Sequence, residues 1–463
     1  MAPPLKAGAR GKGAYYLVRM HGRLRLASSL AVLVLAAALA LPAAVFAGGS
    51  GPSGASAKLG PAPLGGVNVV GLTFDSRPAE ADQAVAYASQ LHAKLIRTEV
   101  SWAVLEPRAA NQIDARAIAF LDRLVGDAAA AGIKVIATLR GTPCWDSSAP
   151  PALLSKCDPA SLSRATAYPP RHPSNYATAA AYLARRYGTR LAAIEVWNEP
   201  DQGNELYFAG PSKPQRYAAV LRAAYPAVKL ANPGVAVLAG SLVGSNGSFL
   251  RALYASVTKG FYDGLAVHYY NQTLGSIRAI RQVQVANGDE KPLWLDEFGW
   301  TSCWPAERVQ QEQGCVTPRV QALNIANIFR SLARTSYIAA EVVFQLHDQV
   351  KESFGLLTAS GAHKPAFSAL ASVLASPFGP VSPVTVALHR RRGRVVAAGS
   401  APVGDYMQLE AFTGNVLRYR ALFTLDRFNR YSVALPRVLG THGLRVRVFQ
   451  FWAGSARAAQ KRI

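Results

Sequence analysis

The sequence predicts an α/β protein with a (β/α)8 TIM barrel, followed by a small all-β sandwich domain. Two observations lead to this prediction. Between residues 65 and 378, eight short runs rich in Val, Ile and Leu alternate with segments of helical apolar periodicity. From residue 381 onward, the pattern changes to short segments in which apolar and polar residues alternate, which is typical of antiparallel strands.

The predicted barrel strands are apolar almost throughout, which indicates a parallel sheet covered by helices. They span residues 68–74, 94–102, 133–139, 191–198, 235–241, 263–270, 292–300 and 339–347. Helical periodicity is clearest over residues 79–93, 115–132, 174–188 and 319–336. An open doubly wound sheet is the alternative, but no glycine-rich phosphate loop follows the first strand. We therefore assign residues 65–378 to one barrel domain.

The accessory domain is predicted over residues 381–455, with a basic tail at residues 456–463. In the segment "LRVRVFQF", arginines fall on one face of a strand and apolar residues on the other. Residues 381–463 contain 14 basic and three acidic residues. We expect either a solvated basic sheet face or a surface that docks to an anionic polymer of the cell surface, to lipid headgroups or to an acidic polysaccharide.

The N-terminal region has the composition of an export signal. Six basic and no acidic residues occur among the first 50, and the apolar run "LAVLVLAAALALPAAVFA" ends at Ala47. Residues 1–47 are therefore predicted to be a signal peptide, with an uncleaved membrane anchor as the alternative and Met20 as a second candidate start. Residues 48–64 have the composition of a flexible linker. The protein is expected to be secreted or extracytoplasmic, or held at the cell surface through this segment.

The net charge of +23 is concentrated at the two ends of the chain. Only +6 remains for the long middle region, from residue 51 to residue 380. A basic patch suited to nucleic acid would need more charge on one face of the main domain. We therefore do not expect a nucleic-acid partner.

Four cysteines fit an exported protein with two disulfides. The local pairing joins Cys144 to Cys157 and Cys303 to Cys315, although the sequence permits three connectivities. None of the four shows CxxC spacing, which argues against a zinc site.

Reactive side chains of a (β/α)8 barrel lie at the C-terminal ends of its strands. Carboxylates, amides, cations and aromatic residues at these ends form one list of candidates: Arg97, Trp102, Arg140, Trp145, Asn198, Glu199, His268, Tyr270, Glu297, Trp300 and Gln345. Glu199 closes the fourth strand and Glu297 the seventh. Two carboxylates across one pocket suit glycosidic bond cleavage, and tryptophans offer flat apolar surfaces to sugar rings.

The motifs around these glutamates resemble those of glycoside hydrolase clan A. "VWNEP" ends the fourth predicted strand, and "LDEFGW" ends the seventh. The longer run "IEVWNEPD", together with "RTEVSWAVLEP" on the second strand, is most similar to family 39 and its relatives, with family 5 next. The resemblance covers most of residues 65–375.

The resemblance implies a role for each matched position. Glu199 matches the general acid and base, Glu297 the nucleophile of a retaining mechanism, and Asn198 the amide that binds the sugar 2-hydroxyl. Three further positions match residues that support the nucleophile: Arg97, His268 and Tyr270. A retaining mechanism would place the two carboxyl groups about 5–5.5 Å apart. No metal or organic cofactor is implied.

Two strand ends depart from the pattern of the clan. Many members end strand eight with a tryptophan, whereas this chain has Phe344, Gln345 and His347 in that region. Strand three offers Arg140, a cation that could favour an acidic sugar such as a uronic acid.

Other acidic residues near the motifs are expected to be structural. Asp296 is predicted to point to the opposite side of its strand from Glu297. Supporting or surface positions are expected for Glu99, Glu106, Glu195 and Asp201.

The sequence thus predicts an exported, monomeric, retaining glycoside hydrolase that cleaves O-glycosidic bonds of a poly- or oligosaccharide by double displacement. A transglycosylase on the same barrel is one alternative. A non-catalytic carbohydrate-binding surface protein is another.

Overall fold

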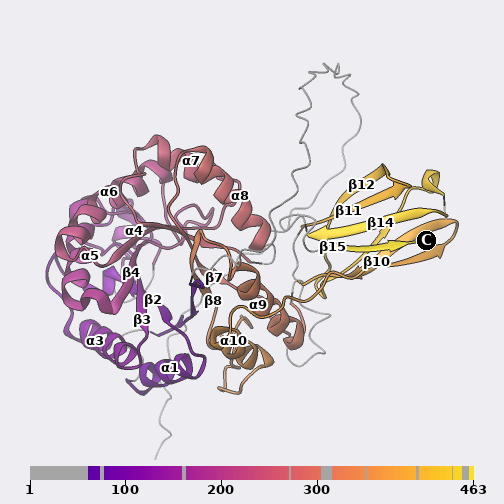
Figure 1. The fold of residues 1–463 in the computed structure, drawn as a ribbon. Coiled ribbons are helices and arrows are strands. Elements are labelled where there is room, and N and C mark those ends of the chain that lie inside the picture. Colours follow the sequence, from indigo (N-terminus) through magenta and orange to yellow (C-terminus); the bar gives the residue numbers. More distant parts are fainter. Residues whose placement is uncertain are drawn as a thin grey trace, which may run out of the picture. The chain divides into compact units, whose positions relative to one another are not determined.

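The computed structural model describes residues 61–72, 78–158, 163–270, 273–303, 315–349, 352–402, 406–440, 442–450 and 458–463. The predicted signal peptide and most of the predicted linker lie outside these residues. Eight parallel strands form a closed barrel in sequential order, which confirms the predicted TIM barrel (Figure 1). In the described part of the chain, no helix is long and apolar enough to cross a membrane.

The barrel strands are β1 (Leu64–Asn68), β2 (Leu95–Ser101), β3 (Lys134–Arg140), β4 (Leu191–Val196), β5 (Ala236–Leu242), β6 (Gly264–His268), β7 (Leu293–Phe298) and β8 (Ile338–Val343). The α-helices are α1 (Pro78–Gln90), α2 (Trp102–Leu105), α3 (Ala115–Ala130), α4 (Pro151–Leu154), α5 (Pro173–Tyr187), α6 (Lys213–Ala231), α7 (Ser248–Ala255), α8 (Thr273–Ala286), α9 (Pro318–Leu332) and α10 (Pro365–Ala375). A 3-10 turn, Gly188–Arg190, leads into β4. The long helices surround the strands in a ring (Figure 1).

The strands are apolar on both faces because each face meets a different part of the core. One set of side chains fills the barrel interior, and it includes Leu95, Ile136, Leu238 and Val342. The larger set packs between the strands and the surrounding helices. Continuous apolar runs therefore follow from burial on both sides, as the sequence predicts.

The first strand begins earlier than predicted. It was expected over residues 68–74, but β1 spans Leu64–Asn68 and includes Gly65 and Gly66. A Cβ atom on Gly66 would lie 2.5 Å from the carbonyl oxygen of Leu95, and one on Gly65 would lie 2.1 Å from Leu374. The glycines are needed because the neighbouring strand and helix approach this closely.

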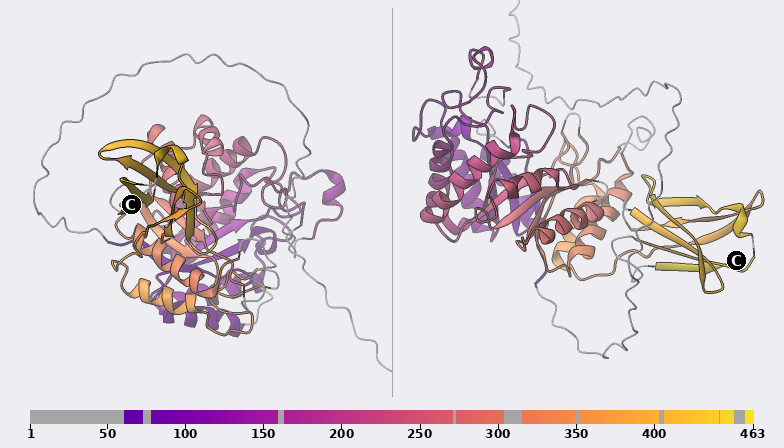
Figure 2. Two further views of the ribbon diagram at one scale, coloured as in Figure 1. Left: turned by 90° about the vertical axis from the view of Figure 1, so that its right-hand side faces the viewer. Right: turned by 90° about the horizontal axis from the view of Figure 1, so that it is seen from above.

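The C-terminal domain is a β-sandwich, as predicted. Its strands are β9 (Ala387–Arg391), β10 (Arg394–Ser400), β11 (Tyr406–Thr413), β12 (Val416–Thr424), β13 (Arg430–Ala434), β14 (Leu444–Gln450) and β15 (Ala458–Arg462), with a 3-10 turn at Arg437–Leu439. They form two sheets, ordered β13-β10-β9 and β12-β11-β14-β15 (Figure 2, orange and yellow). Inward-facing residues of both sheets, such as Val395, Leu409 and Val446, share one hydrophobic core.

The prediction of a loose tail over residues 456–463 is wrong. Residues Ala458–Arg462 form β15, which pairs antiparallel with β14. The segment lacks the alternation of apolar residues that marks the other strands. Its position depends on backbone hydrogen bonds to β14, which composition does not reveal.

A pocket of about 170 Å³ lies at the N-terminal end of the barrel, lined by residues that include Leu64, Lys94, Phe329 and Glu341. This end of a (β/α)8 barrel is opposite the face that holds catalytic residues. Glu341 is 1% exposed, and its Oε2 has no hydrogen-bond partner among the described residues. Burial raises the pKa of the Glu341 carboxyl well above its usual range.

A Glu341→Gln variant should therefore become more stable than the parent protein as pH rises. The pKa of Glu341 is higher in the folded protein than in the unfolded chain. The stabilisation linked to this pKa shift is therefore complete at pH 4, and it is lost as the pH rises towards the pKa of Glu341 in the folded protein. We expect the free energy of unfolding of the variant to exceed that of the parent by at least about 1 kcal/mol at pH 8 and to approach it at pH 4. Urea denaturation at both pH values measures this.

The exposed Glu290 provides the matched control, because Glu290→Gln makes the same chemical change without burial. It should not alter the free energy of unfolding at either pH by more than about 0.5 kcal/mol. Equal behaviour of the two variants would contradict the role assigned to burial of Glu341.

Candidate active site

The C-terminal ends of the barrel strands bring together side chains that are far apart in the sequence. Arg97 lies in β2, Asn198 and Glu199 follow β4, and Glu297 lies near the end of β7. Because the strands are parallel, these positions meet on one rim of the barrel. Glu199 and Glu297 are 7% and 6% exposed, so both carboxylates are largely shielded from water.

Glu297 accepts hydrogen bonds from three side chains. Nη1 of Arg97 donates to its Oε1 at 2.6 Å, and the Asn68 amide donates to the same oxygen at 3.3 Å. The hydroxyl of Tyr270 donates to Oε2 at 2.6 Å. Each of these bonds favours the ionised carboxylate and fixes its orientation.

Glu199 has fewer partners and an unusual backbone. Nδ1 of His268 lies 2.9 Å from its Oε1, and the Gln202 amide donates to Oε2 at 3.4 Å. Trp197 and Glu199 have φ angles of 72° and 49°, in the left-handed region that non-glycine residues rarely adopt. Trp197 is completely buried, so the core holds this backbone in place. Such local strain is common where a reactive side chain must leave a strand in a set direction.

His268 lies between the two glutamates. Its Nδ1 is 2.9 Å from Glu199 and 3.3 Å from an oxygen of Glu297. One oxygen of each glutamate and a ring nitrogen of His268 all lie within 4.8 Å of one another. The three groups therefore form one electrostatic unit.

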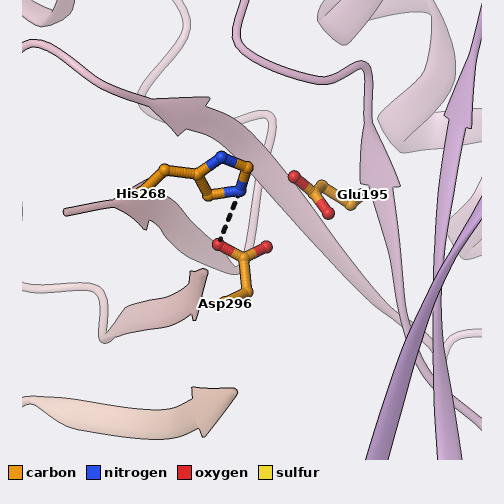
Figure 3. Close-up of side chains that lie close together, drawn as sticks. All are labelled: Glu195, His268 and Asp296. Carbon is orange, nitrogen blue, oxygen red and sulfur yellow. Dashed lines mark ion pairs between the residues drawn. The ribbon is translucent and has the colours of Figure 1, made fainter. Parts of the chain in front are cut away.

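A second layer of charge lies below this unit, inside the barrel. Arg97 donates to Glu195 through Nε at 2.8 Å and through Nη2 at 3.2 Å, and Thr138 donates its hydroxyl to Glu195 at 2.6 Å. The Asp296 carboxylate lies 3.4 Å from Arg97 and 3.5 Å from Nε2 of His268. Figure 3 shows how Asp296 reaches towards the His268 ring, with the Glu195 carboxylate close by.

The prediction that Asp296 points away from the site is wrong. It is completely buried and contacts the same arginine and histidine as Glu297. The pairing of β7 with β8 is irregular between Leu295 and Phe298, and strict alternation of side chains does not hold through an irregular register. Glu195, expected at a supporting or surface position, is a buried supporting residue.

Opposite charges inside the barrel stabilise one another's ionised forms. Burial disfavours the charged form of Arg97, but Glu195 and Glu297 outweigh it and raise the Arg97 pKa well above its usual value. Burial also acts to raise the pKa of Glu195, yet the charge of Arg97 lowers it to about 2. Burial beside the Glu195 charge raises the pKa of Asp296 well above its usual range.

The groups at the rim are coupled through His268. Burial opposes its charged form, but the charge of Glu297 and the hydrogen bond to Glu199 raise the His268 pKa to about 9. Burial acts to raise the pKa of Glu199, while the bond from His268 outweighs it and lowers that pKa. Burial raises the pKa of Glu297 despite the nearby charges of His268 and Arg97. In the free site His268 is thus a cation shared by two carboxylates.

Two tryptophans predicted to line the cleft belong to the core instead. Trp102 is 0% exposed and Trp300 is 3% exposed, so almost no ring surface is open to a sugar. The Trp102 indole donates to Glu106 at 2.8 Å, and the Trp300 ring packs against Phe298. Trp145 is half-buried, and its indole donates to the Glu106 carbonyl at 2.7 Å. Trp102 and Trp300 thus lie at strand ends, but neighbouring side chains cover their rings.

Arg140 is already paired in the structure. Its Nη1 donates to Glu99 at 2.8 Å, and its guanidinium lies 5.9 Å from the centre of the Tyr207 ring. A uronic acid would have to compete with Glu99 for this cation. The pairing therefore weakens the expectation that Arg140 selects an acidic sugar.

The region after β8 differs from a tryptophan-closed site. The Phe344 ring lies 5.9 Å from the Tyr270 ring, edge to face. Gln345 is 1% exposed and accepts a hydrogen bond from Gln349 at 3.4 Å. Among the described residues, no hydrogen bond joins Gln345 to Glu199 or Glu297. Phe344 is therefore the aromatic residue that this strand brings next to the site.

Several supporting residues were not singled out in the sequence. Asn68 contacts Glu297, and the Ser241 hydroxyl lies 3.5 Å from both the Asn198 side chain and the Glu199 backbone N–H. Ser241 ends its predicted strand, so the strand-end rule could have found it. Asn68 was placed at the start of the first predicted strand, and only the observed bounds of β1, Leu64–Asn68, put it at a C-terminal end.

Two groups of residues have the donor types of a metal site: Glu195 with His268 and Asp296, and Glu199 with His268 and Glu297. The guanidinium of Arg97 contacts Glu195 and Glu297 directly. A metal cation at either position would lie close to this fixed positive charge, which disfavours binding. We therefore assign both groups to the arginine and histidine network.

Both predicted local disulfides are present, Cys144–Cys157 and Cys303–Cys315. The first closes the loop after β3 and the second begins the loop after β7. Both loops lie on the face of the barrel that holds the glutamates. The disulfides suggest an extracellular protein.

Comparison with known proteins is consistent with this site. Residues 174–369 match the family model of the glycosyl hydrolase catalytic core. The match includes β4 to β8 and therefore Glu199 and Glu297. No curated protein matches the chain.

Solved structures with a similar fold include family 39 enzymes. A family 39 glycoside hydrolase from Bacteroides cellulosilyticus WH2 is 17% identical, with a TM-score of 0.54 over 81% of each chain. A GH39 β-xylosidase from Caulobacter crescentus is 18% identical, with a TM-score of 0.51 over 76% of this chain and 84% of that one. The GH39 enzyme from Xanthomonas axonopodis pv. citri is 15% identical, with a TM-score of 0.51 over 82% and 93%. At these identities the likeness shows the fold.

Replacing Arg97 with methionine should strongly destabilise the barrel. The change leaves Glu195 and Glu297 without their buried cation, and breaking a buried ion pair costs about 3–5 kcal/mol. Urea denaturation should show this loss in the free energy of unfolding. Arg123, which pairs with Asp82 on the surface and is 48% exposed, is the control. Arg123→Met should cost less than about 1 kcal/mol, and a similar loss in both variants would contradict the central role of Arg97.

Proposed function

We propose that the chain is a glycoside hydrolase of clan A type that cleaves O-glycosidic bonds with retention of configuration, because residues 174–369 match the glycosyl hydrolase catalytic core and the barrel resembles the fold of family 39 enzymes. The substrate is a poly- or oligosaccharide. Glu297 is the nucleophile, and Glu199 is the general acid and base. The observation that best supports this proposal is the approach of the two carboxylates, which bring one oxygen each to within 4.8 Å.

This short separation favours retention over inversion. Retaining enzymes hold their carboxyl groups about 5–5.5 Å apart, whereas inverting enzymes need about 6.5–9.5 Å to admit a water molecule. Glu199 and Glu297 also share His268, which keeps them together. Direct attack by a carboxylate on the anomeric carbon fits this geometry better than attack by an intervening water.

The contacts of the two residues support the division of roles. Glu297 receives hydrogen bonds from Arg97, Tyr270 and Asn68, and these hold an ionised oxygen in one orientation for attack. As Glu297 bonds to the anomeric carbon, the bond to the leaving oxygen breaks and that oxygen takes the proton of Glu199. The product is a covalent glycosyl ester, which water releases in a second step with Glu199 as base.

Asn198 is oriented to bind the sugar. Its Oδ1 accepts from Nη2 of Arg97 at 2.8 Å, so its amide nitrogen is left to donate. A sugar 2-hydroxyl beside Glu297 is the natural acceptor. Arg97 therefore positions both the nucleophile and the substrate-binding amide.

His268 supplies the proton that Glu199 needs. In the free site Glu199 is ionised because His268 donates to it. As Glu297 bonds to the anomeric carbon its negative charge declines, and with it the charge interaction that most raises the His268 pKa. In the same step the proton on Nδ1, 2.9 Å from Glu199, passes through Glu199 to the leaving oxygen. The second step returns a proton from water to His268 by the same route.

A transglycosylase would share the first step but pass the glycosyl group to a sugar hydroxyl. A non-catalytic binding protein would need neither the close carboxylates nor a shared proton. We therefore favour hydrolysis. We also propose that the protein acts as a monomer outside the cytoplasm, where its two disulfides would be stable.

The stereochemistry of the product tests the proposal. Proton NMR of the first sugar released from an aryl glycoside should show the anomeric configuration of the substrate. The panel begins with aryl β-xylosides, because one structural relative is a β-xylosidase. Glu297→Ala should lower kcat by at least about 10⁴-fold, as loss of a nucleophile does elsewhere. An inverted first product would overturn the retaining mechanism, and a sugar-bound protein without turnover on any substrate would overturn hydrolysis.

Replacing His268 with glutamine should affect substrates according to their leaving group. A poor leaving group needs the proton, so its kcat should fall by about 10²–10³-fold, while a dinitrophenyl glycoside should lose little. In the parent enzyme kcat/KM should fall as pH rises through about 9, where His268 loses its proton. In the variant this fall in kcat/KM should occur at lower pH. Equal loss on both substrates with an unchanged pH profile would indicate a structural role only.

A further inference from the structure

The outer surface of the four-stranded sheet in the C-terminal domain is rich in arginine. We call it the arginine face, and it consists of Glu410 and Phe412 of β11, Arg420 of β12, Arg445 and Arg447 of β14, and Arg462 of β15. The alternate residues of these strands, such as Leu409 and Val446, form the core of the sandwich. Four guanidinium groups and one carboxylate thus share one side of a sheet.

The strand register arranges these side chains in rows. Glu410 pairs with Arg420 on one neighbouring strand and with Arg447 on the other. Two residues further along the strand, Phe412 pairs with Arg445, and Arg445 pairs with Arg462. Directly opposed side chains on adjacent strands lie about 4.5–5.5 Å apart at their Cβ atoms. The arginines therefore form a compact cluster.

The carboxylate of this cluster is covered by its partners. Glu410 is 4% exposed, receives hydrogen bonds from Arg420 at 3.2 Å and Gln408 at 2.8 Å, and is held by Arg447. The side chains of Arg420 and Arg447 remain 58% and 32% exposed. A buried carboxylate thus fixes two guanidinium groups whose outer edges are open to solvent.

The second row contains a pair of like charges. Arg445 and Arg462 are directly opposite each other, an arrangement that destabilises a sheet. Within the part of the chain that the structure describes, neither residue forms an ion pair. Arg445 is half-buried and lies over the Phe412 ring at 4.3 Å, and its Nη1 donates to Gln460 at 3.3 Å. The ring and the amide hold this guanidinium beside a second cation.

We propose that the arginine face binds the carboxylate groups of an acidic polysaccharide. A carboxylate bridging Arg445 and Arg462 would relieve their repulsion and could form paired hydrogen bonds with a guanidinium. The fixed groups of Arg420 and Arg447 would receive the next carboxylate along the chain. Because these guanidinium groups are already fixed in the free protein, they lose little conformational freedom when they bind a ligand.

A polysaccharide is favoured over nucleic acid for two reasons. The proposed function is glycoside hydrolysis, and substrates of such an enzyme are found among glycans. The Phe412 ring of the face lies 4.3 Å from the Arg445 guanidinium, and the nearby Phe449 ring lies 5.1 Å from the Arg447 guanidinium, so neither ring offers a stacking surface to bases. Only this choice of partner rests on the proposed function, because binding at the arginine face does not require turnover. The polymer that is bound need not be the one that is cleaved.

The test measures binding of the full chain to polygalacturonate. A Glu297→Gln background prevents cleavage, and affinity should weaken as salt is raised because the contacts are ionic. Arg445→Ala with Arg462→Ala should reduce affinity by at least about tenfold while leaving the Glu410 cluster intact. Arg391→Ala with Arg394→Ala is the matched control, since this pair is also directly opposed across two strands but is exposed at a hairpin end. It should reduce affinity by less than about threefold.

Several results would overturn the proposal. Equal losses for the two arginine pairs would show that binding follows the overall charge of the domain. Absence of binding to polygalacturonate at low salt, or equal binding to a neutral xylan, would exclude carboxylate recognition. Tighter binding to double-stranded DNA that depends on Arg445 and Arg462 would assign the face to nucleic acid. Activity on a small aryl glycoside should be unchanged in the Arg445 and Arg462 double variant. If the parent protein lacks this activity, the proposed function is contradicted, but binding of polygalacturonate at the arginine face is not.

Discussion

The rim of the candidate active site depends on one buried cation, the guanidinium of Arg97. It contacts Glu195, Glu297 and Asn198 within 3.2 Å and has no exposure to solvent. An arginine in this position is tolerable only if carboxylates surround it, because an unpaired buried charge is strongly destabilising. The same carboxylates are tolerable only because of Arg97. Each group therefore fixes the others, and the barrel around them provides the rigid frame.

This mutual dependence extends upwards to His268. Arg97 neutralises Glu195 and part of Glu297, and His268 neutralises the rest of Glu297 together with Glu199. The second cation differs from the first in one respect. Arginine keeps its proton at any physiological pH, whereas histidine can release it when a neighbouring negative charge disappears. In the proposed mechanism, the site therefore uses one fixed cation for orientation and one transferable proton for chemistry.

The sequence predicts those parts of this arrangement that a short local sequence pattern indicates. Apolar runs identify seven of the eight strands and place the first one too late in the chain, and Glu199 and Glu297 interrupt such runs at their ends. Asp296 was misassigned because the irregular register of β7 breaks the alternation on which its prediction rested. Trp102 and Trp300 were misassigned because an indole at a strand end can face a cleft or a helix, and only the helix positions decide which. Gly65 and Gly66 lie before the first predicted strand because glycine gives no apolar signal, yet close neighbours require them in β1.

The two domains use buried charge in opposite senses. In the barrel, the buried Arg97 holds the Glu297 carboxylate, the proposed nucleophile, in one orientation. In the β-sandwich, a hidden carboxylate, Glu410, holds Arg420 and Arg447 so that guanidinium groups face outwards. In both cases the buried member sets the sign and direction of the group that remains accessible. Total charge alone would describe the second domain only as basic. The burial of Glu410 distinguishes an organised cationic surface from arginines that are simply solvated, because a buried acid restricts the guanidinium groups to positions on one face.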